Sequence, residues 1–113
     1  MGDLVLVTFW GEEVVLSAAR QEHIVTHGPP EMLTDNAQPI ADTLQKPELV
    51  LLSAQAPGFQ LFFAWGQNPT RPNHYSKVIV NYKKAPAIVV TAMTSDGPRT
   101  SELLGEVRYD ARS

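Results

Sequence analysis

The chain contains no cysteine, so it can form neither a disulfide framework nor a thiolate metal site. It also lacks any apolar run close to the roughly 18 residues that a membrane-spanning helix requires. The apolar stretch behind Met1-Gly2-Asp3 is short and has no basic leader, unlike a secretory signal peptide. These absences predict a soluble, cytoplasmic protein.

An excess of basic residues is absent as well. The formal net charge of −3 counts against a broad basic surface that grips nucleic acid. The charge is nevertheless uneven, because residues 46–99 carry six lysines and arginines against two acids. We therefore expect the second half of the chain to be locally positive.

Apolar residues make up 43% of the 113 positions, which is enough for one hydrophobic core. The length leaves room for a single domain over residues 1–113. Two short strands, two helices and then a run of strands are typical of the α+β class. The sequence predicts two N-terminal helices packed on an antiparallel four-stranded meander sheet, with short extra strands at the N- and C-terminal ends.

Local patterns predict where these elements lie. Ser17 as an N-cap and Gly28 with two prolines behind it predict a helix over 18–27. An apolar stripe at helical spacing predicts a second helix over 36–45. Strands are predicted from β-branched, aromatic and alternating residues over 4–10, 14–16, 48–55, 59–65, 76–83, 87–93 and 106–110.

The first predicted helix carries Arg20, His23 and His27. At about 100° per residue the three side chains share one narrow arc. Leu16 and Ala19 adjoin this arc, so we expect the arc to lie against the rest of the protein. A histidine there can titrate near neutral pH and act as a general acid or base.

Two other readings of this helix stay open. A histidine on a half-buried helix is often structural. His23 and His27 also have the i, i+4 spacing of half a zinc site, with His74 or Glu31 as a third ligand. The metalloprotease helix requires Glu directly after its first histidine, and here that residue is Ile24.

Four side chains of the later strands are candidates for binding phosphate or a base. Lys77 and Lys83 lie on one face of the predicted strand and could stabilise a phosphate, although strand lysines often face solvent. The Thr91 hydroxyl could bind a phosphate oxygen, although threonine is also a good strand former. Tyr82 could stack on a base, although strand aromatics are more often core residues.

Four segments together resemble a known family. The helix segment RQEHIVTH (20–27), the helix-to-strand segment IADTLQKPELV (40–50), the strand YSKVIV (75–80) and the strand VVTA (89–92) occur in the order typical of it. They are similar to the phage-type nucleases of the barnase, EndoU, colicin and RelE superfamily. One departure is Gly28-Pro29-Pro30-Glu31 after the second histidine, where the family has Pro-Glu.

The resemblance implies a helical layer on an antiparallel meander and RNA cleavage by acid–base chemistry, without a metal or other cofactor. It implies that His23 is a general acid or base, that Lys77 stabilises the phosphate in the transition state and that Thr91 contacts the phosphate. Arg20 and His27 would support catalysis or bind substrate.

The expected partners are therefore RNA and, for a toxin-like nuclease, an inhibitor protein of the antitoxin or immunity type. Lys83 and Tyr82 complete the predicted substrate-binding set with Arg20 and His27. The alternative is a non-catalytic protein-interaction module on the same fold.

Overall fold

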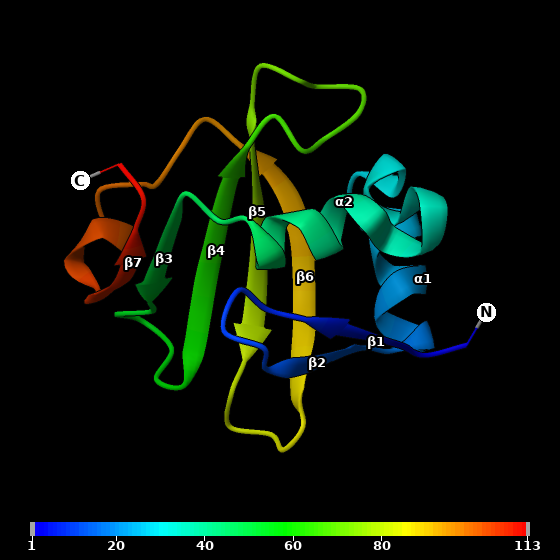
Figure 1. Cartoon of the computed structure of the whole chain (residues 1–113), viewed down its shortest axis with the longest axis horizontal. Coiled ribbons are helices and arrows are strands. Elements are labelled where there is room, and N and C mark those ends of the chain that lie inside the picture. Colours follow the sequence, from blue (N-terminus) through cyan, green and yellow to red (C-terminus); the bar gives the residue numbers. More distant parts are fainter. Residues whose placement is uncertain (1, 113) are drawn as a thin grey trace.

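The computed structural model describes residues 2–112 (Figure 1). Its first half contains the strands β1 (Leu4–Val7) and β2 (Glu13–Leu16), the helix α1 (Ala18–His27), the short 3₁₀ helix η1 (Pro30–Leu33) and the helix α2 (Thr34–Gln45). Its second half contains β3 (Leu49–Leu52), β4 (Phe59–Trp65), β5 (Tyr75–Asn81), β6 (Ala87–Ser95), the 3₁₀ helix η2 (Glu102–Leu104) and β7 (Val107–Asp110).

All seven strands of the described chain form one mixed sheet in the order β1-β2-β6-β5-β4-β3-β7. Neighbouring strands are antiparallel except β2 and β6, which pair in parallel at Val14–Ala87 and Val15–Ile88. The predicted α+β class is confirmed. The predicted four-stranded antiparallel meander is wrong, because β2 and β7 extend the central strands on both sides and one of these additions is parallel.

Helix α1 has the predicted bounds, and its ends have local causes. The Ser17 hydroxyl accepts a hydrogen bond from the backbone N–H of Arg20 at 3.1 Å. At the other end, Gly28 donates its backbone N–H to Ile24 at 2.9 Å. A Cβ at Gly28 would lie 3.3 Å from the carbonyl oxygen of Ala92, so the absence of a side chain lets the helix end lie close to β6.

Helix α2 starts with a turn of the opposite hand. Asp35, Asn36 and Ala37 have φ values of 52°, 56° and 62°, so regular right-handed helix begins at Gln38. Asp and Asn tolerate this conformation, whereas Ala37 adopts it at a conformational cost. Ala37 is nevertheless buried in the core, which accounts for its position.

Two apolar clusters lie on opposite faces of the sheet. The larger joins the inner faces of the helices and the β1–β2 hairpin to buried residues of the central strands, including Phe62, Val78 and Val89. The smaller contains Leu49, Leu51, Leu61 and Phe63. Successive strand residues point to opposite faces, which is why Phe62 and Phe63 belong to different clusters.

The β1–β2 hairpin crosses the face of the central strands instead of extending the sheet flatly (Figure 1). The turn of this hairpin reaches β7, where Arg108 donates a hydrogen bond to Glu12 at 2.7 Å. None of the helices within residues 2–112 is long and apolar enough to cross a membrane.

Candidate functional site

The histidines of α1 face outward, contrary to the expectation that their arc lies against the protein. Arg20, His23 and His27 are exposed, and the buried residues of α1 are Gln21 and Ile24. The prediction was wrong because it relied on Leu16 and Ala19 as markers of the buried side. Leu16 belongs to β2 and Ala19 is itself exposed, so neither marks the face on which the helix packs.

A groove lies where α1 ends beside the last residues of β6. Within the described chain, β2 pairs with β6 only up to Ile88, so the following part of β6 has α1 and not a strand on this side. In Figure 1 the connection from β4 to β5 and the segment after β6 both pass this same end of the sheet. Loops at such a sheet end are common carriers of binding residues.

Three adjoining hollows form this groove, and Thr94 lines all three. The first, of about 430 Å³, is lined by His27, Pro29, Glu31, Arg71 and Met93, among others. The second, of about 280 Å³, is lined by Arg71, His74, Ser95 and Asp96. The third, of about 260 Å³, is lined by Lys77, Met93, Ser95, Gly97 and Arg99, among others. We call the three together the β6 groove.

Two imidazoles border the β6 groove from different segments. His27 comes from the last turn of α1 and His74 from the loop before β5, and Arg71 lines both of their hollows. His74 Nε2 lies 3.8 Å from Asp96 Oδ1, close enough for an electrostatic interaction but not for a hydrogen bond. The ring of His23 lies 5.2 Å from that of His27, measured between centroids. His23 therefore stands next to the groove without lining its hollows.

Lys77 lies at the far end of the groove and has a partner within the chain. Its ammonium forms an ion pair with Glu102 of η2, and each of the two side chains is 9% exposed. Burial raises the pKa of Glu102, but hydrogen bonds from the Arg99 N–H and from Lys77 outweigh burial and lower the pKa overall. The Arg99 N–H bond measures 2.8 Å. Glu102 thus holds both the Lys77 ammonium and the backbone of Arg99 in place.

Thr91 lies near the groove without lining the three hollows. It pairs across the strands with Ile79, while Met93 pairs with Lys77. Cross-strand partners share a face of the sheet, so Thr91 and Lys77 lie on the same side, two residues apart along each strand. Arg20 lies seven residues before His27, about 10 Å along the helix.

The structure separates Tyr82 and Lys83 from the groove. Both follow β5 at the opposite end of the sheet (Figure 1), and six residues of strand-like chain from Lys77 to Lys83 span about 20 Å. The Tyr82 hydroxyl donates a hydrogen bond to Glu12 at 2.7 Å. Burial and this bond raise the pKa of Tyr82 well above its ordinary value. Lys83 is exposed and lies over the ring of Phe59.

The zinc reading required a third ligand near His23 and His27. Among residues 2–112, no group of three or more histidines, aspartates or glutamates is close enough to hold a metal ion. His74 and Glu31, the two residues considered as third ligands, both line the β6 groove, but in different hollows.

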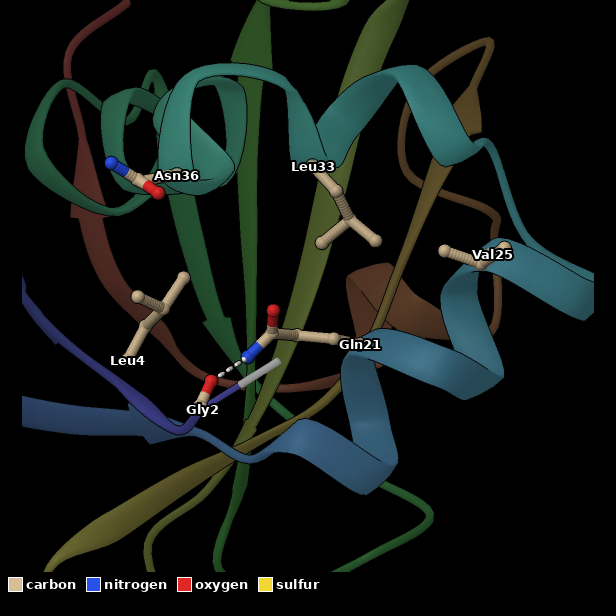
Figure 2. Close-up of a pocket in the computed structure, with 6 residues that line it drawn as sticks. All are labelled: Gly2, Leu4, Gln21, Val25, Leu33 and Asn36. Atoms are coloured by element: carbon tan, nitrogen blue, oxygen red, sulfur yellow. Dashed lines mark hydrogen bonds between the residues drawn. The ribbon is translucent and has the colours of Figure 1, made fainter.

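A further hollow of about 320 Å³ lies between the N-terminal segment and the helices (Figure 2). It is lined by Gly2, Leu4, Gln21, Val25, Leu33 and Asn36. The Gln21 amide donates to the Gly2 carbonyl oxygen at 2.7 Å, which ties the start of the chain to α1. This lining contains no titratable side chain, so it offers no acid or base.

Sequence analysis missed three groove residues with basic side chains. It assigned no role in RNA binding or cleavage to Arg71, His74 or Arg99. All three lie outside regular elements, in the segments 66–74 and 96–101. The one usable signal was the basic surplus of residues 46–99, which includes both arginines. The hollows show that two loops far apart in the sequence place these two arginines along the same groove, in different hollows.

Comparison with known proteins leaves the family open: no family model matches the chain, and no curated protein or solved structure matches it significantly.

Proposed function

We propose that the protein is a metal-independent endoribonuclease that cleaves RNA in the β6 groove. The observation that carries this proposal is that two imidazoles, His27 and His74, line adjoining hollows with one guanidinium, Arg71, common to both. Two groups that can exchange protons and a cation that lines both of their hollows are parts that transesterification at phosphorus requires. The resemblance of four sequence segments to ribonucleases supports the same conclusion.

The proposed reaction uses the 2′-hydroxyl of RNA as its nucleophile. One imidazole removes the hydroxyl proton, and the oxygen attacks the neighbouring phosphorus. Arg71 stabilises the negative charge of the pentavalent phosphorane. The second imidazole then protonates the departing 5′-oxygen, which leaves a 2′,3′-cyclic phosphate and a 5′-hydroxyl. DNA lacks the nucleophile, so it is not a substrate.

Three of the other predicted residues, Lys77, His23 and Thr91, lie at or near this pair, whereas Tyr82 and Lys83 lie at the opposite end of the sheet. Arg99 provides positive charge for a neighbouring phosphate at the third hollow, where Lys77, paired with Glu102, stays a predicted phosphate contact. His23 stands beside His27 and stays a predicted catalytic residue, as an alternative proton carrier or as a group that orients the His27 ring. Thr91 stays a predicted phosphate contact. The net charge of −3 does not oppose the proposal, because Arg71, Lys77 and Arg99 all line the groove.

The test is cleavage of RNA by purified protein in excess chelator. We expect products with 2′,3′-cyclic phosphate ends. Either His27→Gln or His74→Gln should reduce the rate of RNA cleavage about 10²–10⁴-fold. Arg71→Gln should also reduce it strongly, whereas Arg112→Gln, an arginine outside the groove, should not. His23→Gln decides between a catalytic His23, with a loss as large as that of His27→Gln, and an orienting one, with a smaller loss.

Unchanged cleavage by the His27→Gln/His74→Gln double variant would mean that a different site or a contaminant cleaves the RNA. Complete inactivity of the folded wild type on single-stranded and structured RNA would favour the alternative, a non-catalytic interaction module. An inhibitor protein, the other expected partner, would have to cover this groove, and the groove's cations favour an acidic one.

A further inference from the structure

The hollow between the N-terminal segment and the helices is separate from the β6 groove, because the two share no lining residue (Figure 2). Its volume of about 320 Å³ is within the range of sites that enclose small organic molecules. Leu4, Val25 and Leu33 provide apolar walls from β1, α1 and η1. None of the six lining residues has an ionisable side chain, so a charged molecule would lose hydration there without gaining a counterion. The lining therefore suits a neutral molecule with an apolar body.

Gln21 is the buried polar residue of this lining, with 5% of its surface exposed. Its amide nitrogen Nε2 donates to the carbonyl oxygen of Gly2 at 2.7 Å and to that of Leu16 at 3.2 Å. Both hydrogens of the amide are thereby used. The opposite orientation of the amide would place its oxygen against two carbonyl oxygens, which only accept hydrogen bonds. The backbone therefore determines the direction of the Gln21 amide.

This direction points the amide oxygen, Gln21 Oε1, into the hollow (Figure 2). Within residues 2–112, no protein group donates a hydrogen bond to this oxygen. An acceptor on a buried side chain is costly to leave without a donor, because it has lost part of the hydration of the unfolded chain. A bound molecule with an N–H or O–H group would supply the missing donor.

We propose that this hollow binds a small neutral molecule that packs an apolar body between Leu4, Val25 and Leu33 and donates one hydrogen bond to Gln21 Oε1. The inference goes beyond the proposed ribonuclease function, because it uses none of the residues of the β6 groove. The competing explanation is that Gln21 only ties the start of the chain to α1 and that water fills the hollow. The two explanations differ in whether a donor on an apolar molecule improves its binding.

The experiment measures binding of indole and of indene to the whole chain by NMR titration. The two probes have nearly the same shape, but only indole has an N–H donor. Indole should bind saturably, shift the resonances of Gln21, Val25 and Leu33, and bind about three- to tenfold more tightly than indene. Gln21→Met should remove this difference, since a thioether is only a weak acceptor. Asp3 still accepts the Ala18 N–H in this variant and holds the start of the chain.

A second variant, Val25→Trp, tests the location of the site. Val25 lines the hollow and is 48% exposed, so a larger ring there should fill the hollow without entering the core. We expect this variant to bind neither probe. Val107→Trp is the matched control, because Val107 is 57% exposed on β7 and does not line the hollow. It should bind indole as the wild type does.

Absence of saturable indole binding to the wild type would overturn the inference and leave water as the occupant. Binding of indole no tighter than that of indene, or a preference that persists in Gln21→Met, would also overturn it. Unchanged indole binding in Val25→Trp would place the bound probe elsewhere and have the same consequence. The His27→Gln/His74→Gln double variant should bind indole like the wild type while losing RNA cleavage, so this inference and the proposed nuclease function can fail separately.

Discussion

At the scale of single residues, the interaction with the largest consequence is the buried ion pair of Lys77 and Glu102. Sequence reasoning assigned Lys77 to phosphate binding or to solvent, and neither reading included a partner inside the protein. Both side chains are 9% exposed, so each charge depends on the other for compensation. Such pairs contribute little net stability compared with an apolar pair, but the loss of one partner leaves an uncompensated buried charge.

We therefore expect Glu102→Gln to lower the free energy of unfolding by about 3–5 kcal/mol. Arg112→Gln breaks an exposed ion pair with Asp110 and should change stability little. Urea denaturation monitored by tryptophan fluorescence measures both. Equal stability of the two variants would contradict the role assigned to the buried pair.

At the scale of elements, η2 depends on close contact with the end of β3. Leu52 donates its backbone N–H to the carbonyl oxygen of Glu106 at 2.8 Å, which draws the chain after η2 onto the strand. A Cβ added at Gly105 would collide with the carbonyl oxygen of Leu52. Since η2 carries Glu102, this contact also determines where Lys77 is held at the groove.

Gly105→Ala should consequently displace η2 and destabilise the protein by about 1–3 kcal/mol, as overpacked sites commonly do. Gly2→Ala is the matched control, because nothing lies within 4 Å of a Cβ at that position. Thermal denaturation gives the stability. NMR chemical shifts of Lys77 report whether the ion pair has moved. Unchanged shifts would contradict the inference that the contact of Gly105 with Leu52 determines the position of η2.

At the scale of the whole molecule, the two outermost strands of the sheet are joined by side chains. Glu12, in the turn after β1, accepts hydrogen bonds from Arg108 of β7 and from Tyr82, and these partners are 96 and 70 residues away. The Arg108 guanidinium also lies 3.5 Å from the centroid of the Trp10 ring. This cluster holds the hairpin across the sheet and covers the larger apolar cluster.

The cluster makes the stability of the protein depend on pH. Burial raises the pKa of Glu12, but hydrogen bonds from Arg108 and Tyr82 outweigh burial and lower it below the ordinary value of 4.5. The resulting stabilisation is present above that ordinary pKa and is lost as the pH falls through the lower pKa of the folded state. Glu12→Gln should therefore be less stable than wild type at pH 7, with the difference shrinking towards pH 3.

Urea midpoints at several pH values measure this difference, and Glu13→Gln at the adjacent exposed position is the control. A difference between wild type and Glu12→Gln that does not change with pH would show that the carboxylate charge is not what stabilises the cluster.

Local interactions explain what could be read from the amino acids. The bounds of α1 follow from Ser17 and Gly28, and the strand character of 59–65 and 87–93 follows from residues within a few positions of each other. The α+β class follows from the order of such segments. Each of these features depends on residues that are close together along the chain, so it can be recognised in the sequence pattern.

Contacts across the chain decided the rest. The parallel pairing of β2 with β6, the burial of Lys77 against Glu102 and the outward direction of His27 each depend on segments that meet only after folding. The β6 groove likewise joins the end of α1 to the loops that carry Arg71, His74 and Arg99. Burial and charge compensation arise from contacts between segments that are distant in the sequence. The local periodicity of the sequence therefore does not predict them.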